Sequence, residues 1–174
     1  MAGVTARRWL VLAWVCCACA QSPPTGIRNF GEVTAGPHAE AIYRGAQPSE
    51  ASLKDLAAFG IQTVVNLRGD HSAAGEKLRV EALHMQFVHV PLNGLAAPTN
   101  EQIEKLMRVL ETARRPIFIH CQHGSDRTST VVACWRIWHD HWSNQKALEE
   151  AKAYHLSPFE VGMRRFISRY SPRN

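Results

Sequence analysis

The sequence predicts an α/β domain in which a central, mostly parallel sheet of four to five strands is flanked by helices. Short β-branched or apolar runs alternate along the chain with longer segments of helical periodicity. Such alternation needs crossover connections, which favour parallel pairing of the strands. One run, Ile117-Phe118-Ile119, is apolar throughout, which is typical of a strand covered on both faces.

The expected elements follow one another in regular order. Strands are expected at 42–44, 63–67, 85–90 and 117–119. Helices are expected at 49–59, 76–84 and 128–138, with further helices beginning at Ser143 and Ser157. Another helix opens with a capping box of Thr99 and Gln102, and its core face is Ile103, Leu106, Met107 and Leu110. The last three helices are expected to pack together on one face of the sheet.

Two of these helices carry further sequence signals. Ser157-Pro158-Phe159-Glu160 offers an N-cap serine, a proline at N1 and a glutamate at N3. The helix at 128–138 is apolar nearly all round, which predicts a central buried helix. Cys134 lies in it and is expected to be a buried core thiol.

The N-terminal twenty residues differ from the rest of the chain. Arg7 and Arg8 precede an apolar run over 9–20, which is shorter than the about 20 residues of a membrane span. The run ends in Ala18-Cys19-Ala20, the small-x-small form of a signal-peptidase site. We expect a signal peptide at 1–20, an extended N-terminal segment at 21–40 and a single domain at 41–174. The alternatives are an uncleaved anchor and a lipoprotein modified on Cys16, Cys17 or Cys19.

Composition narrows the functional class. Hydrophobic residues make up 45% of the chain and charged residues 20%, which is typical of a globular protein rather than a disordered one. Residues 1–20 hold two Arg and no acid, so their removal lowers the net charge from +5 to +3. That charge is too small to indicate nucleic acid binding.

The mature chain is expected to be exported, periplasmic or secreted, without a stable membrane span. Only Cys121 and Cys134 remain in it, so no disulfide framework is expected.

One stretch, His120-Cys121-Gln122-His123-Gly124-Ser125-Asp126-Arg127-Thr128, joins the buried strand to the next helix. Open α/β sheets bind ligands at this place, beyond the carboxyl ends of the strands. A loop that runs into a helix N-terminus points several backbone N–H groups at one spot, and this arrangement binds a phosphate dianion. The same field favours thiolate over thiol, so Cys121 is the candidate nucleophile.

The other residues of the stretch have candidate roles. Arg127 offers a planar fork that matches two phosphate oxygens, and the hydroxyl of Thr128 can stabilise the thiolate as it leaves. Gly124 permits a positive φ and a close approach of the substrate. His120 is expected to order the loop through hydrogen bonds. The candidate substrate-binding residues are Gln122, His123, Gly124, Ser125, Arg127 and Arg68, the last with a plain surface role as its alternative.

The stretch resembles the His-Cys-x5-Arg-Ser/Thr signature of the protein tyrosine and dual-specificity phosphatase superfamily. Residues 43–48 and 64–68 look like those of small bacterial dual-specificity-like or phytase-like cysteine phosphatases, so the resemblance covers about residues 40–155. It implies a phosphatase-like fold, in-line attack by Cys121, a phosphocysteine intermediate and its hydrolysis by water, with no metal or other cofactor. The implied partner is a phosphoprotein carrying phosphotyrosine or a phosphorylated small molecule such as an inositol (poly)phosphate.

Two positions depart from the family pattern. Ser129 stands where members usually carry Gly. Residues 91–100, where most members carry a general-acid Asp, hold no carboxylate. Our hypothesis is that Asp126 is the acid, as an Asp before the Arg also occurs in the myotubularin lipid phosphatases. The rival acids are Glu101 and Asp70, and a helix cap is the alternative role of Asp126.

Other functions fit parts of the pattern. A rhodanese-like sulfurtransferase also places a reactive Cys in a loop between a strand and a helix. A phosphate-binding module that has lost turnover would keep the loop without its acid. His120, Cys121 and His123 resemble metal ligands, but nothing in the sequence completes the four ligands of a structural zinc site, so no metal is expected.

Overall fold

The computed structural model describes residues 22–34, 37–69 and 72–172. The expected signal peptide at 1–20 and the rival acid Asp70 lie outside this part of the chain. Within it the strands are β1 (Gly31–Glu32), β2 (Ile42–Gly45), β3 (Thr63–Asn66), β4 (Gln86–His89) and β5 (Ile117–His120). The helices are α1 (Glu50–Ala58), α2 (Ser72–Ala82), α3 (Asn100–Thr112), α4 (Asp126–Trp138), α5 (Asn144–Ala153) and α6 (Val161–Arg169), with a short 3-10 helix at His38–Glu40.

The sheet has the strand order β1-β2-β5-β3-β4. β2, β5, β3 and β4 pair in parallel, and only β1 is antiparallel, against β2. This confirms the α/β class with a mostly parallel sheet. The strands β2 and β3 flank β5, and their last residues, Gly45 and Asn66, both lie opposite His120. The segment after β5 therefore begins at the centre of the carboxyl edge of the sheet.

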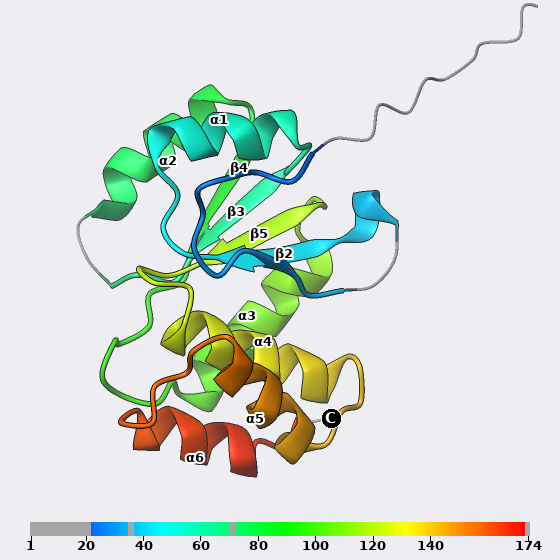
Figure 1. The fold of residues 1–174 in the computed structure, drawn as a ribbon, viewed down its shortest axis with the longest axis vertical. Coiled ribbons are helices and arrows are strands. Elements are labelled where there is room, and N and C mark those ends of the chain that lie inside the picture. The colour runs from blue at the N-terminus through cyan, green and yellow to red at the C-terminus, as the bar shows by residue number, and fades with distance from the viewer. Residues whose placement is uncertain (1–21, 35–36, 70–71, 173–174) are drawn as a thin grey trace, which may run out of the picture.

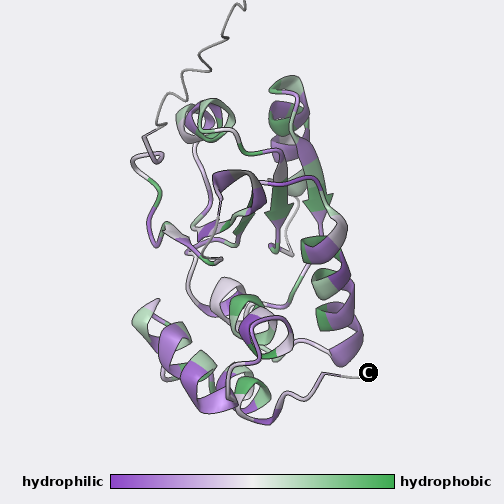
Figure 2. Cartoon of the chain, turned by 90° about the vertical axis from the view of Figure 1, so that its right-hand side faces the viewer, coloured by the Kyte–Doolittle hydropathy of each residue, from purple (hydrophilic) through white to green (hydrophobic). Residues whose placement is uncertain are grey.

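Helices cover both faces of the sheet (Figure 1). α1 and α2 lie on one face, and α3, α4, α5 and α6 lie on the other. Successive residues of a strand point to opposite faces, and each face of the sheet has its own core. Val64 and Phe118 pack toward α1 and α2, whereas Val65 and Ile119 pack toward α3 and α4. Figure 2 shows the strands as mainly hydrophobic and the helices as hydrophilic on their outer sides.

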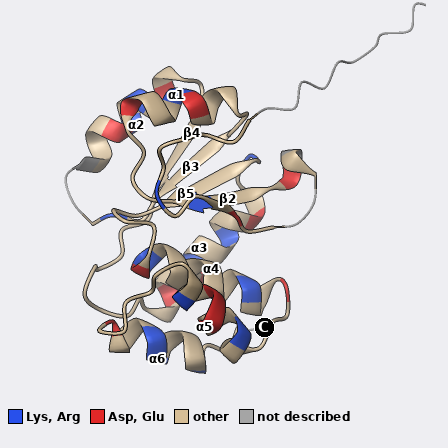
Figure 3. Cartoon of the chain, viewed as in Figure 1, with Lys and Arg blue, Asp and Glu red and all other residues tan. Residues whose placement is uncertain are grey.

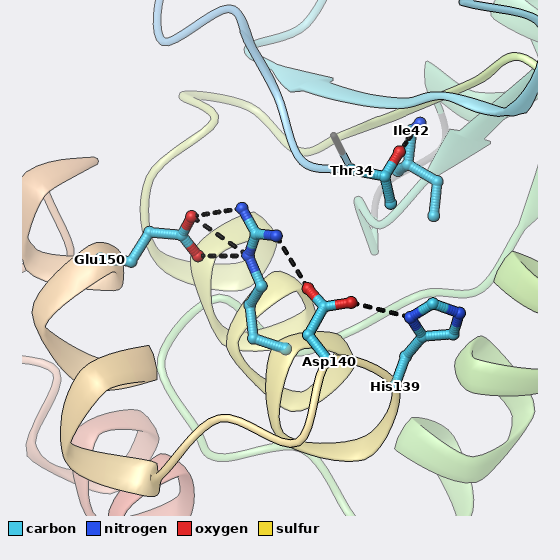
Figure 4. A network of polar contacts seen from close by, with 6 residues as sticks. Thr34, Ile42, His139, Asp140 and Glu150 are labelled. Carbon is cyan, nitrogen blue, oxygen red and sulfur yellow. Dashed lines mark hydrogen bonds and ion pairs between the residues drawn. The ribbon is translucent and has the colours of Figure 1, made fainter. Parts of the chain in front are cut away.

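The last three helices pack together, as predicted. α4 contacts both α5 and α6, and nine of its 13 residues are buried, which confirms the expected central helix. Arg136 on α4 donates hydrogen bonds to Glu150 on α5 (2.7 Å) and to Asp140 (2.8 Å), and Asp140 contacts His139 at 2.7 Å (Figure 4). Charged residues otherwise lie mainly on the helices and loops (Figure 3). The polar network ties α5 to α4, whose first turn contains the end of the signature motif.

Two predicted helix starts are wrong. α6 begins at Val161 rather than Ser157. Residues 157–160 instead form a turn, in which the Glu160 N–H donates to the Ser157 C=O (3.2 Å) and the Phe159 N–H donates to the Ser157 hydroxyl (3.2 Å). α2 begins at Ser72 rather than Glu76. The longer α2 places Glu76 in its second turn, with its side chain on the buried face of the helix.

None of the helices described here is long and apolar enough to cross a membrane.

Candidate active site

The signature loop occupies the turn between the end of β5 and the start of α4. Cys121 follows the last residue of β5 directly and is 2% exposed. Asp126 is the first residue of α4, and the preceding Ser125 makes no side-chain cap to the helix. The loop thus runs from the centre of the sheet edge into a helix N-terminus, as predicted.

The carbonyl groups of the loop all point outward. Those of residues 121–124 accept hydrogen bonds from groups outside residues 121–128. The donors are His120 Nδ1 to Cys121 (3.3 Å), Gln47 N to Gln122 (3.3 Å), Asn29 Nδ2 to His123 (2.9 Å) and Arg44 Nη2 to Gly124 (2.7 Å). Donors from three different segments therefore fix the orientation of each successive peptide plane.

The backbone amides of the loop face the opposite way. Because the peptide group is planar, the N–H of one residue points away from the C=O of the residue before it. No amide of residues 122–128 donates a hydrogen bond to any other residue that the structure describes. Unsatisfied amides converging on a helix N-terminus form an anion-binding concavity. Cys121 directly precedes the residues that supply these amides.

Gly124 is the residue that allows the loop to take this path. Its φ is +71°, in the left-handed region that favours glycine. A Cβ there would lie 2.5 Å from the carbonyl carbon of Gly45 and 2.6 Å from the amide nitrogen of Ala46. The loop therefore packs backbone to backbone against the end of β2, which confirms the conformational role expected of Gly124.

Arg44, on β2, supports the loop from below. It is 1% exposed, and Nη2 donates to the Gly124 carbonyl and to Ser129 Oγ, both at 2.7 Å. Its guanidinium lies 3.9 Å from the ring centroid of Tyr154. Burial lowers the pKa of Arg44 to about 10, a shift that the nearby Tyr154 and Glu150 partly oppose. Ser129, the departure from the family pattern, is thus a hydrogen-bond partner of this buried arginine.

A second buried group, Glu76 on α2, lies behind the loop. Its carboxylate accepts hydrogen bonds from Gln47 Nε2 (2.8 Å) and Asn66 Nδ2 (2.5 Å). His120 Nε2 lies 3.1 Å from Glu76 Oε1, in a close contact that is not aligned as a hydrogen bond. Burial alone would raise the pKa of Glu76, but the close contact with His120 and the hydrogen bonds from the amides of Gln47 and Asn66 hold it below its ordinary value.

Arg127 and Thr128 occupy the first turn of α4. A Cβ added to Gly94 would lie 3.8 Å from the Arg127 guanidinium carbon, so this guanidinium lies beside the loop between β4 and α3. Thr128 is fully buried, and its hydroxyl has no hydrogen-bond partner among the described residues. A buried hydroxyl without a partner is unusual, and it is available to a group that enters the site.

Asp126 is tied to a distant part of the chain. Its Oδ1 accepts a hydrogen bond from the Ser157 amide (2.8 Å) and its Oδ2 from the Ser125 hydroxyl (3.2 Å). Neither contact caps α4, so the capping alternative for Asp126 is wrong. Of the rival acids, Glu101 lies exposed in the first turn of α3, and Asp70 is outside the described residues.

The remaining predicted residues take different places. Arg68 is half-buried after β3, where its Nη1 donates to Gln47 Oε1 at 3.0 Å. In the loop, Gln122 is half-buried and His123 is exposed. Cys134 is completely buried, which confirms it as a core thiol, and burial raises the pKa of its thiol.

Sequence reasoning missed Arg44 and Glu76. A charged residue in the otherwise buried strand 42–45 was the available signal for Arg44. Ala73, Glu76 and Val80 are all buried and stand at i, i+3 and i+7, so Glu76 occupies a core position of α2. Placing the start of that helix at Glu76 hid this spacing. Among the described residues there is no cluster of three or more His, Cys, Asp or Glu side chains that could hold a metal ion.

Comparison with known proteins gives consistent results. A family model described as "DSP-PTPase phosphatase fused to NAD+ Kinase" matches residues 23–168. Probable NAD kinase 2, chloroplastic, from Oryza sativa subsp. japonica is 32% identical over 104 residues, which are 55% of this chain and 10% of that protein. Dual specificity protein phosphatase TpbA from Pseudomonas aeruginosa is 30% identical over 117 residues, which are 63% of this chain and 49% of that protein. The chain thus spans at most about half the length of these relatives.

A solved structure extends the comparison to the fold. The core catalytic domain of the PP-IP phosphatase SIW14 from S. cerevisiae superposes with a TM-score of 0.71 at 22% identity. The alignment covers 83% of this chain and 86% of that domain, so the two share their architecture over nearly their whole length.

Proposed function

The chain belongs to the family of DSP-PTPase phosphatases described as fused to NAD+ kinase, and from this membership we propose that it hydrolyses phosphate monoesters with Cys121 as nucleophile. The observation that carries the proposal is the orientation of the signature loop. Its carbonyls are all turned outward, and the amides of residues 122–128 remain available beside Cys121. Such an array binds a phosphate dianion and favours the thiolate.

The residues suggest a two-step reaction. The phosphate oxygens accept hydrogen bonds from the loop amides and from the Arg127 guanidinium, which places phosphorus in line with the Cys121 sulfur. Sulfur attacks, the ester oxygen leaves with a proton, and a phosphocysteine forms. Water then attacks phosphorus and the thiolate departs, with the unpartnered hydroxyl of Thr128 donating to the sulfur. Asp126 is the proposed donor of the leaving-group proton.

Two substrate classes are proposed for this site. TpbA is named as a dual specificity protein phosphatase, and SIW14 as a PP-IP phosphatase. A phosphotyrosine side chain and an inositol (poly)phosphate both present a phosphate monoester to the loop. Arg68, beside the loop, and the exposed His123, within it, suit additional phosphates. A phosphate-release panel of phosphotyrosyl peptides and inositol phosphates distinguishes the classes by kcat/KM.

The central test is hydrolysis of an aryl phosphate by the wild-type chain and by Cys121→Ser. We expect turnover in the wild type and its loss in the variant, while Cys134→Ala, which changes the buried thiol outside the loop, keeps turnover. A wild-type chain that binds phosphate without hydrolysing it would indicate a binding module. Formation of a Cys121 persulfide from thiosulfate, without phosphate release, would indicate a sulfurtransferase.

We also propose that the chain is exported and that residues 1–20 are removed as a signal peptide. The support is the sequence alone: Arg7 and Arg8, the apolar run after them, and the Ala18-Cys19-Ala20 site. Expression of the full chain with fractionation and N-terminal sequencing tests this. A mature chain that begins at Gln21 supports it, a lipidated Cys indicates the lipoprotein, and an intact N-terminus in the cytoplasm contradicts export.

A further inference from the structure

We propose that the surface formed by the β4–α3 connection and by α6, with the turn before it, docks the protein on a membrane that carries anionic lipids. The proposal goes beyond the proposed function, because it concerns a surface outside the signature loop and requires no hydrolysis. We call this surface the α6 surface. It presents the apolar side chains of Leu95, Phe159 and Val161 and a groove that contains Arg165 and Arg169.

The exposed apolar side chains of the protein gather on the α6 surface. Among the described residues, four large apolar side chains are strongly exposed, and three of them are Leu95 (88%), Phe159 (90%) and Val161 (57%). The fourth, Leu78, lies on α2, on the opposite face of the sheet. Single exposed apolar residues are ordinary, whereas several on adjacent segments mark an interaction surface.

A contact between Gly162 and Ala97 brings the two segments of this surface together. A Cβ added to Gly162 would lie 3.5 Å from the Ala97 amide nitrogen and 3.8 Å from the Ala97 Cβ. Leu95 precedes Ala97 by two residues, and Val161 adjoins Gly162. Figure 1 shows the β4–α3 connection and the start of α6 side by side, next to the start of α4. The exposed apolar side chains therefore come from two neighbouring segments.

A groove of about 530 Å³ continues the α6 surface along the helix. Arg165 and Arg169, which line it, are exposed and lie one helical turn apart. Two guanidinium groups in a groove of this size fit the phosphate of a lipid headgroup. The groove lining comes from both segments: Ala97, Asn100, Gly162, Arg165, Phe166 and Arg169.

The charge of the α6 surface is positive (Figure 3). α6 carries three arginines and no acid, and residues 91–100 on the facing wall hold no carboxylate. The first acids beyond these segments are Glu101, which follows that wall, and Glu160, which is half-buried before α6. An arginine near an anionic membrane strengthens binding about fivefold. Charge complementarity therefore selects a surface of anionic lipids.

The exposure of the apolar side chains favours a membrane over a peptide. A bound peptide lies in a groove against apolar pockets, whereas Leu95 and Phe159 are almost fully exposed on separate segments. Apolar side chains flanked by arginines insert between headgroups and acyl chains, and binding increases with the apolar area buried there. Docking in this way places the signature loop beside the membrane, because Gly94, in the same connection as Leu95, adjoins the Arg127 guanidinium.

The decisive experiment measures co-sedimentation with vesicles of phosphatidylcholine, with and without about 30% phosphatidylglycerol. It uses the chain without residues 1–20, which keeps every described residue. We expect binding to the anionic vesicles that weakens about 30-fold in Arg165→Gln/Arg169→Gln, since each arginine contributes about fivefold. Leu95→Ser/Phe159→Ser should weaken it about tenfold through loss of apolar burial.

The matched control is Leu78→Ser/Arg79→Gln, which removes an exposed apolar side chain and an exposed arginine from α2. It should bind the anionic vesicles like the wild type. Absence of wild-type binding, or equal losses in the control and in the α6-surface variants, overturns the proposal. If no vesicle binds and Arg165→Gln/Arg169→Gln instead raises KM for an acidic phosphotyrosyl peptide, the surface docks a peptide and the proposal is wrong.

A second measurement in the full chain reports contact at the α6 surface itself, whatever residues 1–20 bind. Brominated lipids in anionic vesicles should quench the added tryptophan of Phe159→Trp but not that of Leu78→Trp, each compared with the parent chain. Equal quenching at both positions, or none at residue 159, contradicts docking through this surface.

Vesicle binding and hydrolysis can be separated. Cys121→Ser should bind anionic vesicles like the wild type, and Arg165→Gln/Arg169→Gln should keep kcat/KM for a soluble aryl phosphate. Loss of vesicle binding with hydrolysis intact counts against the α6 surface alone, whereas a wild type that binds vesicles without hydrolysing phosphate counts against the proposed function alone.

Discussion

The carboxylate of Asp126 accepts a hydrogen bond from the backbone amide of Ser157 at a distance of 2.8 Å. This contact links the first residue of α4 to the connection between α5 and α6, 31 residues further along the chain. It gives Asp126 a structural role beside the acid role proposed for it. The acid role needs a proton on the side chain, whereas the structural role needs only an oxygen that accepts a hydrogen bond, so a substitution can separate the two roles.

We expect Asp126→Asn to lower kcat for an alkyl phosphate by about 10²–10⁴-fold. The loss for an activated aryl phosphate should be only a few-fold, because its leaving group needs no proton. Asn keeps an oxygen that can accept from the Ser157 amide, so the link should survive. The measurement is steady-state kinetics on both substrates, and Glu101→Gln tests the rival acid in the same way. Equal losses on the two substrates would assign Asp126 a structural role alone.

The path of the loop around Gly124 predicts a large stability effect. Gly124→Ala would bring a Cβ to 2.5 Å from a backbone atom of Gly45 at a φ of +71°. We expect a loss of about 2–5 kcal/mol in the free energy of unfolding, measured by urea denaturation. Gly26→Ala is the matched control, because its φ is +80° and nothing lies within 4 Å of the added Cβ. Similar losses in the two variants would mean that φ alone, not contact with β2, restricts Gly124.

Local signals predicted much of the fold. The capping box at Thr99 and the start of α5 at Ser143 are local in sequence, and both are confirmed as N-caps. The signature loop is predictable for the same reason, because strand, loop and helix are contiguous. The order of the strands is set by pairing between distant segments, so periodicity carries no information about it.

The errors have tertiary causes. Ser157 has every local feature of an N-cap, but it opens a turn whose first amide is bound by the distant Asp126, and α6 begins at Val161 instead. Glu76 looks like an ordinary acidic residue near a helix start until the full length of α2 places it on the core face. Arg44 is buried in β2, and the groups that accept its hydrogen bonds, Gly124 and Ser129, lie more than 79 residues away in the sequence. Partners of buried charges are seldom near them in sequence.

The depressed pKa of Glu76 predicts a dependence of stability on pH. Below its ordinary value of 4.5 the unfolded chain binds a proton that the folded chain resists, so the stability due to Glu76 is complete above that value. It is lost as the pH falls through the lower folded-state value. Glu76→Gln should cost about 1–3 kcal/mol at pH 7 and show a shallower decline below pH 4.5. Urea unfolding from pH 7 to pH 3 measures both.

Asp140 provides an internal reference for this measurement. Its burial would raise its pKa, but hydrogen bonds and charge from Arg136 and His139 lower it, so it also loses stabilisation at acid pH. That contribution is present in the wild type and in Glu76→Gln alike. The difference between the two pH curves therefore isolates Glu76, and parallel curves would contradict the assigned pKa direction.

Exposed apolar side chains beside the loop predict a preference among leaving groups. Leu95 is 88% exposed and Phe159 90% exposed. Leu95 follows Gly94, which adjoins the Arg127 guanidinium, and Phe159 lies two residues after the Ser157 bound to Asp126. These contacts place the two segments beside Arg127 and Asp126, at the end of the signature loop. Because the two side chains are exposed and lie in segments that adjoin the loop, they are available to contact the organic part of a substrate.

We expect the double substitution of Leu95 and Phe159 by Ser to raise KM for aryl phosphates and phosphotyrosyl peptides about 3–10-fold, because partial burial of two such side chains contributes about 1 kcal/mol. KM for inositol phosphates, which present hydroxyl and phosphate groups, should stay within twofold. Leu78→Ser is the control, since Leu78 is 72% exposed on α2, a helix on the opposite face of the sheet from α4 and α6. An equal rise for both substrate classes would show that the substitutions disturb the loop itself, because loss of an apolar contact can discriminate only against substrates that have an apolar part.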